Sequence, residues 1–391
     1  MTVHSETIDP GAILMATASD PHGAYAVMRQ RCPVARSDLF GSPVVYMFRY
    51  EDVTWALRHP EYFSSEGDPI GLAEQPMIPL QIDPPLHTKY RRLMSPPFSS
   101  SEIKRLEPDL RNLVCERIDS FEREGRCNFH EQFATPLPTS FFLALMGLPA
   151  SDLTMFLRWR DETIRPDVAD TEAVAIRKRV GEEINAYFEG AIAARRTEPV
   201  PGLLSDLIGS EIDGEPLTET ELLGMSHLIL LAGLDTVTAA LDCVFAHLAR
   251  HPDRRHQIVG DPLLIPAAVE EFLRWETPVT MVIRSVKHPI EIRGVQLQEG
   301  DHVVLSLGAA NMDEAEFGEA EFRPARRPNR HLAFGSSNHF CMGAHLARAE
   351  LRIAIDEFHK RIPDYRLADG CDPIFSAAIR HSETLVLNWD V

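Results

Sequence analysis

The sequence of 391 residues is 44% hydrophobic and 25% charged, which is the composition of an ordinary globular protein. Its net charge of −19 disfavours nucleic acid or an anionic membrane surface as the main partner. The N-terminal segment lacks the basic-then-apolar order of a secretory signal peptide, so we expect a cytoplasmic protein.

Helical periodicity dominates the chain. Apolar residues recur at helical spacing in Ser101–Arg123, Glu131–Met146, Thr171–Arg195, Thr218–Arg250, Pro262–Trp275 and Gly343–Arg361. Short alternating segments, typical of strands, are Val44–Phe48, Val282–Val286, Ile290–Ile292 and Val303–Leu305. No internal repeat and no flexible linker divides the chain. We therefore expect a single domain of residues 1–391, mainly α with a small β lobe, whose β-rich portions lie near residues 40–65, 280–306 and 373–391.

The segment Tyr62–Pro85 has little periodicity and many Gly and Pro residues. A loop of such length inside a compact domain is usually functional. We therefore predict a lid over a binding site.

The most apolar stretch starts at a helix signal, because Thr218 and Glu221 have the spacing of a capping box. A helix from there to Arg250 is apolar almost all round, which indicates a buried core helix. It is long enough to span a bilayer, but ionisable residues within it, such as Asp235 and Asp242, are too costly in lipid. We expect no membrane anchor.

Residues 232–236, Ala-Gly-Leu-Asp-Thr, lie in the middle of this predicted helix. Glycine costs about 1 kcal/mol relative to alanine in a helix interior, and a buried Asp needs a partner. The hydroxyl of Thr236 can donate back to the carbonyl of Ala232, which loosens the helix and opens a groove. Taken alone, the pattern favours a packing kink and a functional site equally.

Two later features are also ambiguous in isolation. Glu271 and Arg274 are spaced i, i+3 on a predicted helix, which is usually surface pairing. Cys341 lies between a glycine-containing loop and a helix, whose N-terminal amides and dipole favour a thiolate. Since the six cysteines have neither zinc-site nor disulfide spacing, Cys341 is a nucleophile, a metal ligand or a buried apolar residue.

The order and context of these features resemble the cytochrome P-450 family in its soluble bacterial form. The matching motifs are H-x-x-x-R at His87 and Arg91, A/G-G-x-D/E-T at Gly233, Asp235 and Thr236, E-x-x-R at Glu271 and Arg274, and F-G-x-G-x-H/R-x-C-x-G at Phe334, Gly335, His339, Cys341 and Gly343. Two positions depart from the family's pattern. Ser337 replaces the second glycine of the cysteine loop, and Met312 replaces the arginine of N-R-D, which we interpret as a surface or packing change.

The resemblance implies a mainly α cytochrome P-450 triangular-prism fold with heme b (iron protoporphyrin IX) as the cofactor. Cys341 would be the metal ligand, as the thiolate that binds the heme iron. The other roles are assigned by the match alone. They are shielding of the sulfur by Phe334, a heme-loop position for Gly343, propionate binding by His87, Arg91, Arg284 and His331, proton delivery by Asp235 and Thr236, and a structural ion-pair cluster of Glu271, Arg274 and Arg326.

The implied reaction is monooxygenation, in which one oxygen atom of O2 is inserted into a hydrophobic small molecule (terpenoid, steroid, fatty-acid-like or aromatic). Electrons would come from NAD(P)H through a ferredoxin reductase and a ferredoxin, and we expect a monomer. The local basic patch for docking the ferredoxin would be Lys89, Arg91, Arg92, His345 and Arg348.

Three alternatives were weighed against this interpretation. A Cys-dependent hydrolase or transferase needs a base near Cys341, and His339 two residues earlier is poorly placed. A relative that binds heme or a carrier protein without oxygenating does not need the pair Asp235 and Thr236. A peroxide-driven enzyme does not need that pair either.

Overall fold

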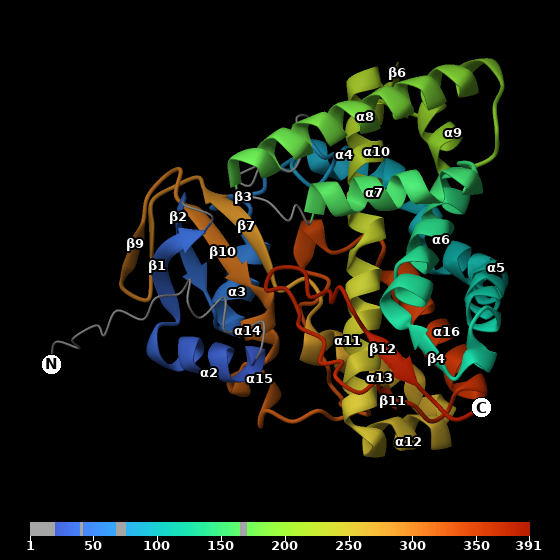
Figure 1. Ribbon diagram of the computed structural model, residues 1–391. Coiled ribbons are helices and arrows are strands. Elements are labelled where there is room, and N and C mark those ends of the chain that lie inside the picture. Colours follow the sequence, from blue (N-terminus) through green and yellow to red (C-terminus); the bar gives the residue numbers. More distant parts are fainter. Residues whose placement is uncertain (1–19, 40–41, 68–75, 165–169) are drawn as a thin grey trace, which may run out of the picture. The chain divides into compact units, whose positions relative to one another are not determined.

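The computed structural model describes residues 20–39, 42–67, 76–164 and 170–391 (Figure 1). The chain groups into two compact units, each described by itself. Unit 1 comprises Met1–Glu66, Leu263–Cys341 and Asp372–Glu383, and unit 2 comprises Gly67–Pro262, Met342–Cys371 and Thr384–Val391.

Unit 1 is built on a five-stranded sheet of order β1-β2-β10-β7-β3. The strands are β1 (Val34–Leu39), β2 (Ser42–Met47), β10 (His302–Ser306), β7 (Met281–Val286) and β3 (Phe63–Ser64). Strand β2 pairs parallel to β10, and the other pairs are antiparallel. Figure 1 shows this mixing of the chain, with β1 and β2 from near the N-terminus beside β10 and β7 from the last third.

Alternation along β2 explains how both faces of this sheet are covered. Val45 and Met47 pack with residues of α3 (Tyr50–Arg58). Val44 and Tyr46, which point the opposite way, pack with residues of α2 (Pro21–Arg31). The other elements of the unit are α13 (Ile265–Glu276), β8 (Ile290–Ile292), β9 (Val295–Leu297), α14 (Leu307–Asn311) and α15 (Glu314–Phe317).

Unit 2 is mainly helical. Its helices are α4 (Leu86–Met94), α5 (Ser100–Asp119), α6 (Pro136–Met146), α7 (Leu153–Ile164), α8 (Asp170–Thr197), α9 (Leu203–Ile208), α10 (Glu219–Leu234), α11 (Thr236–Arg250), α12 (Pro252–Gly260) and α16 (Ala344–Arg361). Two small sheets pair β4 (Arg126–Asn128), β12 (Val386–Asn388) and β11 (Arg366–Leu367), and β5 (Glu211–Ile212) with β6 (Glu215–Pro216). In Figure 1, α10 and α11 follow one another as a single column that α7 and α8 cross.

The predicted core helix is confirmed, with a break. Thr218 and Glu221 form the expected capping box, and 78% of the most apolar window of Glu219–Arg250 is buried, as in the core helix of a soluble protein. The column divides at Asp235 into α10 and α11. Part of the predicted lid, residues 68–75, lies outside the described residues.

Candidate functional site

The loop before Cys341 is held in one shape by its own backbone. The N–H of Cys341 donates to the carbonyl of Phe334 at 2.8 Å, and the N–H of Gly335 donates to Leu332 at 2.8 Å. Gly335 and Ser337 both have left-handed backbones, with φ of 68° and 62°. The loop leaves Cys341 as the one exposed cysteine of the six, whereas the other five are buried or half-buried.

The left-handed Ser337 decides between two possibilities that the sequence left open. Serine in place of the family's glycine either reshapes the loop or accepts strain. Its φ of 62° is the conformation that glycine adopts freely and other residues rarely adopt. Ser337 therefore keeps a glycine-like backbone at the cost of strain.

His331 and Arg284 lie in unit 1 with Cys341. The ring Nδ1 of His331 accepts the N–H of Ala333 at 3.2 Å, so Nδ1 carries no proton. The remaining ring nitrogen, Nε2, therefore donates to Glu270 Oε2 at 3.0 Å. Arg284 is buried in β7, where one guanidinium nitrogen donates to the carbonyl of Ile283 at 2.7 Å.

Glu271, Arg274 and Arg326 are brought together in one buried cluster. Arg274 donates to both oxygens of Glu271, at 2.8 and 2.7 Å. Arg326 adds a third cationic contact at 3.0 Å, and Asn329 and the backbone of Arg323 donate as well. Because every partner donates to a carboxylate taken out of water, the buried charge of Glu271 is compensated.

The departure at Met312 is a packing change and not a surface change. Met312 is buried, and its sulfur lies 3.5 Å from a guanidinium nitrogen of Arg274. The preceding Asn311, also buried, accepts the N–H of Leu332 at 2.6 Å and donates to Thr277. Asn311 thus anchors the start of the cysteine loop, a role that no local sequence signal reveals.

In unit 2, the break in the core column has one accessible face. Nearly all side chains from Leu222 to Ala249 are buried, but Ala232 is exposed and Gly233 and Thr236 are half-exposed. These residues share a helix face, so a space lies beside it. The hydroxyl of Thr236 donates to the carbonyl of Ala232 at 2.9 Å, as predicted. Asp235 beside it is fully buried.

The other predicted residues of unit 2 lie on α4 and at the start of α16. His87 is buried, and burial together with the charge of Arg91 lowers the pKa of His87. Tyr90 on the same helix donates to Glu221 of the capping box, which ties α4 to α10. Gly343 is the N-cap residue of α16.

The predicted site residues therefore divide between the units. Unit 1 contains Arg284, His331, Phe334, Cys341 and the cluster of Glu271, Arg274 and Arg326, and unit 2 contains His87, Arg91, Asp235, Thr236 and Gly343. In the part of the chain that the structure describes, no group of three or more His, Cys, Asp and Glu could hold a metal ion.

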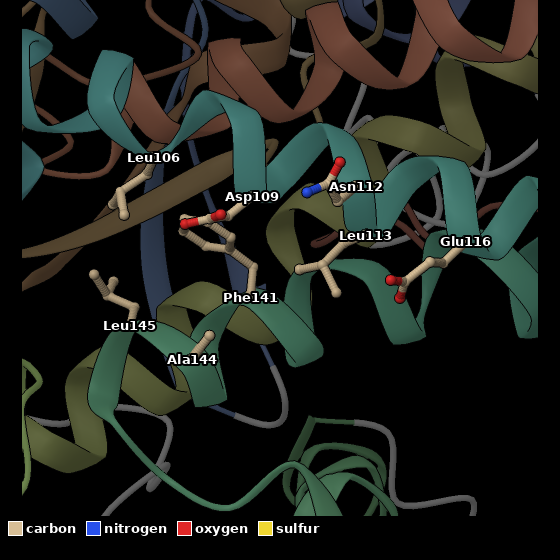
Figure 2. Close-up of a pocket in the computed structure, with 8 residues that line it drawn as sticks. All are labelled: Leu106, Asp109, Asn112, Leu113, Glu116, Phe141, Ala144 and Leu145. Carbon is tan, nitrogen blue, oxygen red and sulfur yellow. The ribbon is translucent and has the colours of Figure 1, made fainter.

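A surface groove of about 330 Å³ lies elsewhere, between α5 and α6. Figure 2 shows Leu113 of α5 and Phe141 and Leu145 of α6 lining it, with Asp109 and Glu116 beside them. None of the predicted site residues lines this groove.

The residues present fit a heme. Cys341 supplies an exposed sulfur on a hydrogen-bonded loop, which is the single protein ligand that a heme iron needs on its proximal side. The accessible face at Ala232, Gly233 and Thr236 is apolar except for one hydroxyl, as suits a flat apolar group with O2 beside it.

Comparisons with known proteins point the same way. A family model described as cytochrome P-450 matches residues 262–358. The steroid C26-monooxygenase of Mycobacterium tuberculosis is 35% identical over 89% of this chain and 87% of its own length. The methyl-branched lipid omega-hydroxylase of Mycobacterium bovis is 31% identical over 94% of this chain and 90% of its own.

Solved structures agree with the sequence relatives. A Bacillus megaterium enzyme crystallised with testosterone has a TM-score of 0.89 and 28% identity, over 96% of this chain and 99% of its own. The cytochrome P-450 of the Bacillus subtilis bacillaene polyketide synthase has a TM-score of 0.88 and 28% identity, over 96% and 98%.

Proposed function

This chain belongs to the cytochrome P-450 family, and on that premise we propose that it hydroxylates the end of an alkyl chain on a steroid or a branched lipid. It has the family's mainly α fold with small sheets. It is a monooxygenase that uses heme b and O2 on a hydrophobic organic molecule. Membership removes the Cys-dependent hydrolase from consideration.

The observation that carries the substrate proposal is shared by two relatives. One is named for C26 of a steroid, and the other for the omega position of a methyl-branched lipid. Both names describe oxidation at the far end of an alkyl chain. The apolar approach to Thr236 supports it here, because Leu228 and Ile229 precede Ala232 on the same column without a charged side chain.

The bound heme supplies the centre at which O2 is activated. Cys341 would hold its iron as a thiolate, which favours cleavage of the O–O bond, and Phe334 would shield the sulfur. Thr236 would hold a proton donor at its hydroxyl, and Asp235 would exchange protons with solvent.

His87, Arg91, Arg284 and His331 would bind the two propionates. Carboxylates taken out of water need cationic or N–H partners, and these side chains supply them. The proton of His331 is already on Nε2, so this nitrogen could donate to a propionate in place of Glu270.

Electrons would reach this heme from NAD(P)H through a ferredoxin reductase and a ferredoxin. We further propose a cytoplasmic monomer in which the two units form one domain of residues 1–391.

A panel of three probes tests the substrate proposal. Purified holoprotein is titrated with cholest-4-en-3-one, with testosterone, which has no alkyl side chain, and with a methyl-branched fatty acid, and turnover products are identified. We expect a spin-state shift and a terminal alcohol with the two chain-bearing probes. Ring hydroxylation of testosterone as the preferred reaction would overturn the proposal while leaving the monooxygenase activity intact.

A further inference from the structure

A π-helical turn, η3 (His130–Ala134), lies against α11 in unit 2. The sequence predicted one helix over Glu131–Met146, but this prediction was wrong at its start. The turn closes with a bond from the N–H of Thr135 to the carbonyl of His130 at 2.9 Å. Such turns are rare and occur frequently at functional sites.

Two threonine hydroxyls bond across the break between α10 and α11, with different reach. That of Thr236 donates to Ala232 within the column. That of Thr238 lies 3.0 Å from the carbonyl of Leu234 and 3.0 Å from the carbonyl of Ala134 in η3. A hydroxyl has one hydrogen, so these two carbonyls share it. Thr238 therefore joins the break to η3.

A second tie lies one helical turn further along α11. Nδ1 of His130 is 2.8 Å from Oδ2 of Asp242, and its Nε2 is 3.3 Å from the hydroxyl of Thr135. Asp242 and Thr238 are fully buried, so water does not compete for these bonds. Positions 238 and 242 share one face of α11, and both contacts are to η3.

We propose that Thr238 is a positioning residue for oxygen activation, with the pair of His130 and Asp242 as its support; this inference rests on the proposed function. The two ties fix the rotation of α11 about its axis at its first turns. Thr236 is the first residue of α11, so its hydroxyl is set by that rotation. A broken helix keeps one geometry only where surrounding contacts over-determine it.

Thr238→Val tests the proposal, because it removes the hydroxyl and keeps the shape. The fraction of consumed NAD(P)H that appears as hydrogen peroxide is measured beside product, heme content and substrate-induced spin shift. We expect this fraction to rise several-fold toward that of Thr236→Ala, with heme content and substrate affinity unchanged. Thr238→Ser, which restores the hydroxyl, should return it toward wild type.

The matched control is Thr163→Val on α7, which removes another buried threonine hydroxyl from unit 2 and should leave coupling unchanged. If Thr238→Val fails to load heme, Asp242→Asn provides the second variant and should raise peroxide in the same direction.

Wild-type coupling in Thr238→Val, while Thr236→Ala is uncoupled, would overturn the positioning role and leave the proposed function standing. A wild-type protein without product or a thiolate spectrum would overturn both.

Discussion

Asp235 and Thr236 place a buried carboxyl beside an accessible hydroxyl at the break of the core column. Thr236→Ala should leave heme and substrate binding intact and divert consumed NAD(P)H to hydrogen peroxide, since the proton donor loses its place. Asp235→Asn should slow turnover by about 10²-fold, the lower end of general acid–base effects. Both are measured as product and peroxide per NAD(P)H. Unchanged product yield in both variants would contradict this proton path.

Ser337 has a positive φ that glycine adopts without strain. Ser337→Gly should therefore stabilise the holoprotein by about 1 kcal/mol in urea unfolding. The neighbouring Ser336, with an extended φ of −154°, is the matched control. Ser336→Gly should destabilise by about 0.5–1 kcal/mol, because glycine there only adds freedom to the unfolded chain. A destabilised Ser337→Gly with a shifted reduction potential would show that the loop depends on serine.

Single residues also show where sequence reasoning ends. The bond of Thr236 to Ala232 spans four positions and could be predicted. The bond of His331 to Glu270 spans 61 positions, and no local pattern encodes it. The same holds for Asn311, whose contact with Leu332 depends on the tertiary fold.

At the scale of elements, apolar periodicity predicted the long helices and the central strands well, because the faces that they bury are continuous. It was wrong where proline intervenes. Pro136 and Pro138 lack the N–H groups that a helix continuing from Glu131 would need, so η3 ends at Ala134 and α6 begins at Pro136. The predicted Ser101–Arg123 helix likewise ends early, at Asp119.

Helices α4 and α16 carry the predicted ferredoxin patch. Lys89 is ion-paired with Asp213, so Arg92, which is exposed, and Arg348 are the better candidates for docking. Reduction by ferredoxin should slow as salt rises, because salt screens such contacts over about 8–10 Å. Arg92→Glu or Arg348→Glu should slow reduction by about tenfold without changing substrate affinity.

Stopped-flow reduction across a salt series measures this effect. Arg366→Glu, an exposed arginine on β11, is the control for the change in net charge. Salt-independent kinetics with both charge reversals silent would show that these arginines are only solvated.

At the scale of the whole molecule, the family and its cofactor could be predicted from motifs, but the sheet of unit 1 could not. Its parallel pair joins β2 to β10, at opposite ends of the sequence. Periodicity identifies strands and says nothing of their partners.

Two buried groups should shape the pH dependence of stability. Burial raises the pKa of Glu350 to about 8, and no described residue bonds its Oε2. The folded state therefore keeps this proton, and the stability that it contributes is complete below pH 4.5 and lost as pH rises through 8. Burial and nearby Arg255 lower the pKa of His359 to about 3, so its contribution is complete above pH 6.5 and lost on acidification.

Glu350→Gln should accordingly flatten the fall in stability between pH 6.5 and 8, where the ordinary pKa of histidine has already been passed. The difference from wild type should reach up to about 5 kcal/mol above pH 8. Urea unfolding at a series of pH values measures it. Parallel curves for the two proteins would mean that Glu350 has a partner or ionises in the folded state.

The most direct test of the account is the carbon monoxide difference spectrum of the reduced protein, recorded for wild type and Cys341→Ala. Thiolate ligation red-shifts the Soret band, so wild type should show the shifted band and Cys341→Ala should lack it. The same band should survive single replacement of each other cysteine, namely Cys32, Cys115, Cys127, Cys243 and Cys371. A variant without Cys341 that kept the shifted band would contradict the assignment on which the whole account rests.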